Sequence, residues 1–467
     1  MIFLHGVAGM TERFDAIVIG AGQAGPPLAG RLSRARMKTA VIERHLVGGT
    51  CVNVGCIPTK TLVGCARVAY TARDASRFGV NISDVSVDMR QVKARKDEIA
   101  GGSNEAVEAW IAGMENVELI RGHARFTAPK TIQVDQRTLE ADKIFLDVGA
   151  RARVPDLPGI KEIDYVTNST MMDVDFLPEH LVIVGGSYIG LEFAQMYRRF
   201  GAKVTVIEMA DRLIGREDPD VSEAVREILE SEGVTVRLKA ECITFQALPD
   251  GVGVGIKCEK EDNPIDGSHV LLAVGRVPNT EDLGLENAGI ETDERGFIRV
   301  DDELRTNVDG IWAMGEVNAR GAFTHTAYND FEIVAANLLD NDPRSVADRI
   351  LCYGLFIDPP LGRVGMTESQ VRASGREALI GTRRMAHVGR AREFGETRGF
   401  MKVMVDAKTE EILGAAILGL NGDEAVHSLL DVMYAARSYK TISRAVHIHP
   451  TVSELIPTVL QSLEPMD

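Results

Sequence analysis

The stretch AIVIGAGQAG at residues 16–25 places an apolar run directly before three closely spaced glycines. This pattern predicts a β-strand, a tight turn and the start of a helix, with Gly20, Gly22 and Gly25 lining the turn. A following apolar run, TAVIE, ends on Glu43. In a dinucleotide-binding unit the glycines let the backbone approach a pyrophosphate at the helix N-terminus, and the acidic residue binds the ribose hydroxyls. The stretch therefore predicts a Rossmann-like unit.

The same pattern recurs in the middle of the chain, where LVIVGGSYIG at residues 181–190 precedes a run that ends on Glu208. The first glycine and the carboxylate are 23 positions apart in both copies. The second copy departs from the pattern at Ser187, which stands where the second glycine normally lies and adds a side chain near the pyrophosphate. Two copies predict an α/β protein with two Rossmann-like dinucleotide-binding domains. We assign Gly185, Ser187, Gly190 and Glu208 to the second nucleotide site.

The carboxylate of Glu208 also indicates which nicotinamide cofactor binds. A carboxylate at this strand end pairs with a free 2′-hydroxyl and repels a 2′-phosphate. We therefore expect NADH to be preferred over NADPH. Arg212 lies four residues further on and could reach a phosphate, so NADPH stays open as the alternative.

The segment GGTCVNVGCIPTK at residues 48–60 carries two cysteines, Cys51 and Cys56, five positions apart. One helical turn plus one residue separates them, which can bring two sulfurs within bonding distance. Such a pair alone is also typical of structural thiols. Its place after a glycine-rich phosphate loop and an acidic strand end indicates a redox-active disulfide beside a flavin, with Gly49 and Thr50 at the same site. The other cysteines, Cys65, Cys242, Cys258 and Cys352, carry no evident role, and buried small residues are the default expectation.

Length and composition limit the classes of protein that fit. A chain of 467 residues predicts about two to four domains. The net charge of −16 argues against nucleic acid and anionic membranes as partners. No apolar run reaches the roughly 18 residues that span a bilayer, and the first residues lack the basic region of a secretory signal. Six cysteines suggest one active disulfide in an otherwise reduced chain, so we expect a cytoplasmic protein without a metal site.

The rest of the chain predicts how the domains are arranged. Residues 61–115 show helical periodicity, and residues 116–150 contain short strand patterns that end at Gly149. The second nucleotide domain closes at Gly275, and a later strand ends on Gly315 and Glu316. The segments that end at Gly149 and Gly275 resemble the strand-glycine exits that join the flavin and nicotinamide domains of two-dinucleotide flavoproteins. This resemblance implies a loose extension (1–12), the first part of an FAD-binding domain (13–154), an NAD(P)-binding domain (155–276), the second part of the FAD-binding domain (277–340) and a dimerisation domain (341–467).

The last 127 positions of the chain carry no nucleotide motif. Residues 401–419 predict two strands around a polar turn. A helix is expected next, with Asn421 as its N-cap and Glu424 completing a capping box. Its apolar face would be formed by Val426, Leu429, Leu430 and Met433. We expect an α+β domain that docks to a partner subunit.

The motif HIHPTVSE at residues 447–454 contains the best candidate for a base. Histidine exchanges protons near neutral pH, and Glu454 could orient the imidazole of His449 and stabilise its protonated form. A histidine near a chain end is usually a surface residue, but the cysteine motif upstream favours catalysis here. His447 is interpreted as structural.

The order of these motifs over residues 14–460 resembles the class I pyridine nucleotide-disulfide oxidoreductases, which include glutathione reductase, dihydrolipoyl dehydrogenase and mercuric reductase. The resemblance implies a homodimer with FAD, NAD and interface domains, in which His449 and Glu454 complete the active site of the other subunit. It also implies a cis His449–Pro450 bond and a contact of Glu316 with the ribityl chain. The family residue at the position of Glu316 is usually Asp, so this carboxylate is one methylene longer.

The resemblance further implies a role for each residue in electron transfer. Tyr188 matches an aromatic residue that gates the nicotinamide, and Lys60 paired with Glu192 matches an ion pair near the flavin. Cys56 would be the thiolate beside the flavin, and Cys51 the thiol that attacks substrate after His449 takes its proton.

Several substrates remain open at this stage. The motifs are most similar to the mercuric reductase branch, yet the chain lacks an N-terminal CxxC and a vicinal cysteine pair near residue 467, which a soft metal relay would need. We therefore expect a reductase of a small disulfide or a reactive oxidant, with dihydrolipoyl dehydrogenase and mercuric reductase as alternatives. A non-catalytic flavin-binding or metal-binding protein is the alternative from a different class.

Overall fold

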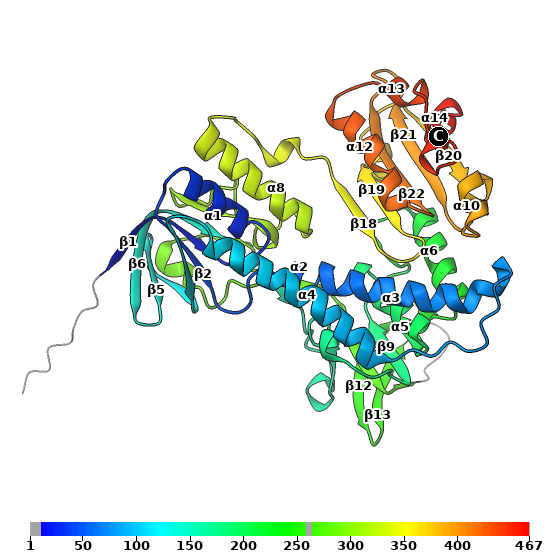
Figure 1. Cartoon of the computed structure of the whole chain (residues 1–467), viewed down its shortest axis with the longest axis horizontal. Helices are drawn as coiled ribbons and strands as arrows, with labels where there is room; N and C mark the ends of the chain where they lie inside the picture. Colours follow the sequence, from blue (N-terminus) through cyan, green and yellow to red (C-terminus); the bar gives the residue numbers. More distant parts are fainter. Residues whose placement is uncertain (1–10, 258–263, 467) are drawn as a thin grey trace, which may run out of the picture. The chain divides into compact units, whose positions relative to one another are not determined.

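The computed structural model describes residues 11–257 and 264–466, and these divide into two compact units (Figure 1). Unit 1 comprises Met1–Thr61, Lys93–Arg153 and Gly275–Arg349. Unit 2 comprises Leu62–Val92, Val154–Val274 and Ile350–Asp467. Residues 1–10 of the expected loose extension and Cys258 lie outside the described residues, and Glu12 already belongs to the first strand.

Unit 1 is built on a mixed sheet. Its strands, in spatial order, are β3 (Val117–Arg121), β2 (Thr39–Glu43), β1 (Glu12–Ile19), β6 (Arg137–Leu146), β5 (Thr131–Val134) and β4 (Ala124–Ala128), with β17 (Ile311–Ala313) also paired to β6. The pairs among β3, β2, β1, β6 and β17 are parallel, and β4, β5 and β6 form an antiparallel meander. A short ribbon joins β7 (Ala150–Ala152) to β16 (Arg276–Pro278). The parallel core is the arrangement expected for a dinucleotide-binding domain.

The strand β1 shows why this sheet is buried on both faces. Ala16 and Val18 pack with α1 (Gly25–Arg34) and α8 (Thr324–Ala335), which lie side by side (Figure 1). Ile17 and Ile19 belong to the core on the opposite face. All four side chains are buried, and a continuous apolar run is typical of a central parallel strand. The long helix α4 (Met89–Ala112) contributes Ile111 to the first of these cores.

Unit 2 contains a second parallel sheet. Its strands, in spatial order, are β11 (Thr235–Arg237), β10 (Lys203–Ile207), β9 (His180–Val184), β15 (His269–Leu272) and β8 (Val166–Thr167). The helix α5 (Tyr188–Phe200) follows β9, and α6 (Pro219–Ser231) lies between β10 and β11 in sequence. An antiparallel sheet of β12 (Glu241–Leu248), β13 (Gly251–Lys257) and β14 (Ile265–Gly267) adjoins it. The two Rossmann-like units predicted from the sequence are thus present.

The C-terminal part of unit 2 is an α+β domain. Its antiparallel sheet has the order β18 (Cys352–Leu355), β19 (Leu361–Gly365), β22 (Ile412–Leu418), β21 (Phe400–Asp406), β20 (Ala378–Arg384) and β23 (Glu464–Pro465). The helices of this domain are α9 (Glu368–Ala373), α10 (Gly389–Glu393), α11 (Gly422–Ala425), α12 (His427–Tyr434), α13 (Lys440–Ser443) and α14 (Ile456–Gln461). The expected apolar face is confirmed, because Val426, Leu429 and Leu430 are buried in the core and Met433 packs against it.

Two details differ from the expectations. Asn421 is the N-cap residue of α11, as expected, but the capping box is wrong, because Asn421 has a left-handed backbone (φ 55°) and its side chain makes no cap hydrogen bond. An N-cap side chain normally reaches the first amides from an extended backbone, which Asn421 does not have. The helix also breaks at Val426 into α11 and α12. Cys242 is exposed and also has a positive φ of 52°, so the default expectation of a buried small residue is wrong there.

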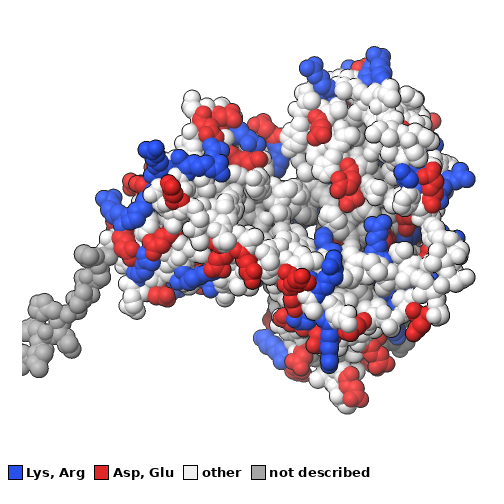
Figure 2. All heavy atoms as spheres, in the orientation of Figure 1, with Lys and Arg blue, Asp and Glu red and all other residues white. Residues whose placement is uncertain are grey.

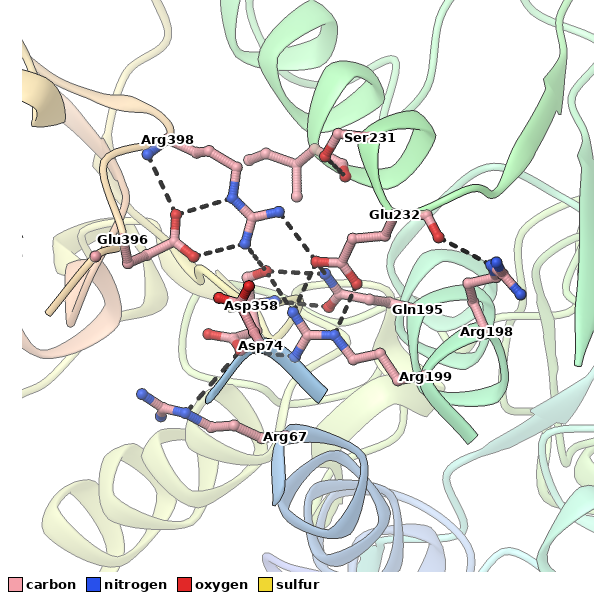
Figure 3. Close-up of polar contacts among 12 residues, drawn as sticks. Arg67, Asp74, Gln195, Arg198, Arg199, Ser231, Glu232, Asp358, Glu396 and Arg398 are labelled. Carbon is pink, nitrogen blue, oxygen red and sulfur yellow. Dashed lines mark hydrogen bonds and ion pairs between the residues drawn. The ribbon is translucent and has the colours of Figure 1, made fainter. Parts of the chain in front are cut away.

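A buried ionic network, centred on Glu232 at the end of α6, links distant segments of unit 2 (Figure 3). Glu232 pairs with Arg199 of α5 and with Arg398, and Arg199 pairs with Asp358. The guanidinium of Arg199 also lies 3.9 Å from the ring centroid of Tyr70, on helix α3 (Cys56–Asp74). The network therefore connects the three sequence segments that make up unit 2: Tyr70 lies in the first, Arg199 and Glu232 in the second, and Asp358 and Arg398 in the third.

The surface carries many charged side chains of both signs (Figure 2). Acidic and basic side chains are interspersed on the face shown in Figure 2. Across residues 11–257 and 264–466, no helix is long and apolar enough to cross a bilayer.

Candidate active site

The first glycine turn packs closely against neighbouring backbone. Gly20 has a φ of +99°, and a Cβ there would lie 2.2 Å from the carbonyl oxygen of Asp147. A Cβ at Gly25 would lie 2.4 Å from the carbonyl oxygen of Gly20. Only glycine fits at these two positions, and the turn leads directly into the N-terminus of α1, where Pro26 and Pro27 occupy the first turn.

The strand-end acid Glu43 lies at the start of this turn. Its carboxylate accepts hydrogen bonds from the backbone N–H of Ala21 (2.9 Å) and of His45 (2.7 Å). A tight glycine turn, a helix N-terminus and an oriented carboxylate together fit the pyrophosphate and ribose of a dinucleotide such as FAD.

The structure also places an acid inside this turn that the sequence patterns did not reveal. Asp147 follows β6, and its Oδ2 accepts a hydrogen bond from the backbone N–H of Gly25 at 2.7 Å. Burial raises the pKa of the Asp147 carboxyl to about 8, against the lowering effect of the loop amides. Only the strand order, with β6 beside β1, brings residue 147 to residue 25.

The two cysteines lie at the starts of neighbouring helices. Cys51 is in α2 (Gly49–Asn53), and Cys56 is the first residue of α3. Both are thiols in this structure. The Sγ of Cys56 lies 3.3 Å from Oγ1 of Thr324, the first residue of α8. Thr324 is a neighbour that the motif itself could not identify.

The two thiols differ electrostatically. A hydrogen bond with Cys56, together with burial, raises the pKa of the Cys51 thiol well above its usual range. A helix N-terminus, where Cys56 lies, stabilises a thiolate. The surroundings of Cys51 thus disfavour a thiolate there, whereas the position of Cys56 favours one.

The acid Glu316 is paired with an arginine. Both oxygens of its carboxylate accept from Nε of Arg276, at 2.7 and 2.9 Å. The same guanidinium also donates to the backbone carbonyl of Ala150 and contacts Oγ1 of Thr50 at 3.5 Å. Arg276 stands next to the predicted residue Gly275, and the structure connects it to Thr50 and Glu316 of the expected flavin site.

The second nucleotide turn, in unit 2, resembles the first. Glu208 accepts from the backbone N–H of Gly186 (2.7 Å) and of Ala210 (2.8 Å). Ser187 is the N-cap residue of α5, with an extended backbone and no side-chain cap. The serine side chain is thus not used to hold the helix.

Tyr188, the first residue of α5, packs edge-on against Tyr353 with ring centroids 5.5 Å apart. Burial raises the pKa of Tyr188 to about 12, so its hydroxyl stays protonated. The hydroxyl of Tyr353 donates to Glu217 at 2.6 Å, and Glu217 is paired with the fully buried Arg363. This chain of contacts holds the two rings in place.

The expected partners Lys60 and Glu192 lie in different units. Lys60 follows Cys56 by one helical turn on α3. Glu192 is buried on α5 and accepts from the backbone N–H of Phe356 at 3.0 Å. Their pairing with each other stays a prediction.

The candidate base lies at the surface of unit 2. Nδ1 of His449 contacts the two carboxylate oxygens of Glu454 at 2.9 and 3.1 Å. The His449 side chain is 81% exposed, whereas that of Glu454 is 16% exposed. The His449–Pro450 bond is cis, as expected. The contact with Glu454 occupies Nδ1 and leaves Nε2 for proton exchange.

The structure groups the candidate residues within each unit. In unit 1 it brings Cys51, Cys56 and Thr324 together, and places Thr50 near Glu316 through Arg276. In unit 2 it brings His449 to Glu454. In the part of the chain that is described, no cluster of three or more His, Cys, Asp or Glu is arranged to hold a metal ion.

Comparison with known proteins covers nearly the whole chain. The family model for "Pyridine nucleotide-disulphide oxidoreductase" matches residues 14–330, and the model for the dimerisation domain of that family matches residues 352–460.

Among curated proteins, the probable pyridine nucleotide-disulfide oxidoreductase RclA of Escherichia coli is 37% identical over 95% of this chain and 98% of its own. A dihydrolipoyl dehydrogenase of Chlorobaculum parvum is 35% identical, with 96% of each chain covered. A mercuric reductase of Streptomyces lividans is 31% identical, again with 96% of each covered.

A solved structure described as the HOCl-induced flavoprotein disulfide reductase RclA from Escherichia coli superposes with a TM-score of 0.88 at 36% identity. The match covers 96% of this chain and 99% of that chain. The fold, the two family models and the relatives agree, and the chain belongs to the pyridine nucleotide-disulfide oxidoreductase family.

Proposed function

We propose that this protein is an FAD-dependent reductase that passes electrons from NADH to a small disulfide or a reactive oxidant through Cys51 and Cys56. The observation that carries the proposal is the asymmetric thiol pair, in which Cys51 keeps its proton and Cys56 lies at a helix N-terminus beside Thr324. Membership of an FAD-dependent oxidoreductase family supports it.

The residues of unit 1 fit FAD. The turn of Gly20, Gly22 and Gly25 would hold the pyrophosphate, and Glu43 the adenosine ribose. Gly49, Thr50, Gly149, Gly315 and Glu316 are assigned to the remainder of the cofactor. When bound, FAD supplies the two-electron relay between a reduced nicotinamide and the disulfide.

The thiol pair performs the reduction of the substrate. The Cys51 sulfur attacks one sulfur of a substrate disulfide, and the other substrate sulfur leaves as a thiol. Cys56 then displaces the substrate from the mixed disulfide and forms the Cys51–Cys56 bond. The substrate gains two electrons and two protons, and the dithiol loses them.

This sequence requires a base, because the raised pKa keeps Cys51 protonated at neutral pH. We assign that role to His449, which Glu454 orients through Nδ1. An imidazole held by a carboxylate can accept a proton at Nε2 and form a stabilised imidazolium.

A homodimer would bring His449 to the thiols of the other subunit. Val446 and Ile448, next to His449 in the chain, are 101% and 80% exposed. Neighbouring apolar side chains that are this exposed favour an interface with another subunit. The match to the family dimerisation domain supports the same assembly.

Glu208 supports a preference for NADH. Two backbone N–H groups hold its carboxylate at the end of β10, where it would face the 2′ position of the ribose. A 2′-phosphate there would meet a fixed negative charge. Arg212, the residue that could instead reach a 2′-phosphate, donates to the backbone carbonyl of Gly215 at 3.3 Å.

The relationship to the HOCl-induced reductase RclA supports a role in defence against oxidants, and we propose a cytoplasmic location for this work. The second candidate is dihydrolipoyl dehydrogenase. It is favoured by Glu208, since that activity runs toward NAD, and by the relative from Chlorobaculum parvum.

The test starts from anaerobic enzyme reduced with one equivalent of NADH and mixed separately with lipoamide, glutathione disulfide, Hg(II) and hypothiocyanous acid. Reoxidation is followed by the long-wavelength absorbance of the Cys56 thiolate beside bound flavin. Fast loss with an oxidant and slow loss with lipoamide is the expected result. Fast loss with lipoamide alone would identify a dihydrolipoyl dehydrogenase, and a missing thiolate band would refute the cysteine assignment.

A further inference from the structure

The carboxyl group of Asp147 is buried against the first glycine turn. Oδ2 of Asp147 is hydrogen-bonded to the backbone N–H of Gly25 at 2.7 Å. A Cβ placed on Gly22 would lie 2.9 Å from Oδ2, and one placed on Gly315 would lie 3.3 Å from Oδ1. The carboxyl group therefore lies between the turn and Gly315, and Asp147 is only 6% exposed.

This position brings the carboxyl close to where a cofactor pyrophosphate would bind. Gly25 is the first residue of α1, and its N–H is one of the amides that a helix N-terminus leaves unpaired. Those amides and the positive end of the helix attract an anion. An ionised Asp147 and a pyrophosphate would therefore compete for the same amides and repel each other.

We propose that FAD binding to this turn requires a neutral Asp147 carboxyl, so that the protein takes up a proton with the cofactor whenever Asp147 is ionised. The neutral group keeps its place between the turn and Gly315 without adding a negative charge next to the phosphates. The inference rests on the assignment of FAD to unit 1.

Among the polar neighbours of Asp147, Glu43 disfavours its ionisation, whereas the backbone N–H groups of Gly22, Ala24 and Gly25 favour it. Glu43, at the end of β2, repels a charge on Asp147. On α8, Asp330 accepts from the backbone N–H of Gly315 at 2.8 Å and is paired with Arg349. The first turn of α1 carries no acidic residue, and its basic residues lie in the last turn.

Glu316, which follows Gly315 in a short 3-10 turn, and its partner Arg276 are the next charged groups to consider. Glu316 is neutralised by Arg276, whose Nε lies 2.7 Å from it. The arginines near the turn are thus already paired with Asp330 and Glu316. The negative charge of Glu43 acts on Asp147 and favours the neutral acid.

The sign of the pH effect follows from these contacts. Burial and Glu43 raise the pKa of Asp147 to about 8, so the acid is neutral at pH 7 and ionised at pH 9. Bound phosphates would raise this pKa further. Linkage then weakens FAD affinity about tenfold for each pH unit above 8, until the pKa of the FAD-bound form is reached.

The test measures FAD retention by the holoenzyme and does not use turnover. Holoenzyme is diluted to nanomolar concentration at pH values from 7 to 9.5, and the fluorescence of released FAD gives the dissociation constant. We expect a nearly constant value around pH 7 and an increase of about sevenfold between pH 8.3 and 9.3. Asp147→Asn should retain FAD with no such increase.

Asp142→Asn is the matched control, because Asp142 is exposed on β6, the strand that directly precedes Asp147, and should show the wild-type profile. A wild-type dissociation constant that does not change up to pH 9.5 would overturn the proposal, whether or not Asp147→Asn folds. An unchanged slope in a folded Asp147→Asn would overturn it as well. Because FAD retention is scored without substrate, a failure of the proposed reductase activity would remain distinguishable.

Discussion

The ionic network of unit 2 gives the sharpest prediction about stability (Figure 3). The Glu232 side chain is 4% exposed. It accepts from Nε and Nη2 of Arg199 (both 2.7 Å), from Nη1 of Arg398 (3.0 Å) and from Nε2 of Gln195 (3.1 Å). Glu232→Gln keeps the shape but replaces one acceptor by an amide that faces these donors. It also removes the negative charge that both arginines share.

Breaking a buried ion pair on one side costs about 3–5 kcal/mol, because a charge stays buried without its counter-ion. Asp358 still compensates Arg199 at 2.6 Å, and Glu396 still compensates Arg398. We therefore expect Glu232→Gln to lower the free energy of unfolding by about 3 kcal/mol, the lower end of that range. With an m-value of about 3 kcal/mol/M, the urea midpoint should fall by about 1 M.

The assay is a urea titration of the holoenzyme followed by far-UV circular dichroism. Both tryptophans, Trp110 and Trp312, lie in unit 1, so tryptophan fluorescence provides a separate signal for that unit. The control is Glu223→Gln on α6, which removes a 52% exposed partner of Arg226 and should cost about 0.5 kcal/mol or less. Equal midpoint shifts for the two variants would refute the reasoning that burial sets the cost.

Four further predictions concern catalysis and assembly. Cys51→Ser should keep FAD and the Cys56 thiolate absorbance but lose disulfide reduction; turnover at wild-type rate in a steady-state assay would contradict its role as the attacking thiol. His449→Gln should lower kcat about 10²–10⁴-fold at neutral pH, where Cys51 keeps its proton unless a base removes it; a kcat within a factor of two of wild type would exclude it as the base. Glu208→Ser should narrow the preference for NADH over NADPH in kcat/KM, and an unchanged ratio would remove Glu208 from cofactor choice. Ile448→Glu should give monomers by sedimentation velocity and abolish disulfide reduction, whereas an intact dimer would place the interface elsewhere.

The sequence alone determined those features whose residues are close together in the chain. The glycine turns were predicted because strand, turn and helix follow one another within a few residues. Of the two carboxylates, Glu43 ends β2 and Glu208 directly follows β10. The thiol pair and the His449–Glu454 contact were equally local. The family match confirms the class of enzyme that these motifs indicated.

The local rules failed where the backbone conformation depended on surroundings. Asn421 has a residue type and spacing that favour an N-cap, yet it takes a left-handed conformation and caps nothing with its side chain. The assignment of Glu316 to the cofactor is a different case, because it stays a prediction, and the structure adds that Arg276 holds its carboxylate.

Only the tertiary structure decided which polar groups share a buried environment. Asp147 and Gly25 are 122 positions apart, and Glu232 and Arg398 are 166 positions apart. Strand order places the end of β6 beside the first glycine turn, and packing within unit 2 brings Arg398 to the end of α6. Burial and the charge of such distant neighbours set the pKa of Asp147 and the stability of the network. These quantities arise from desolvation and charge proximity in three dimensions, which no local pattern in the chain records.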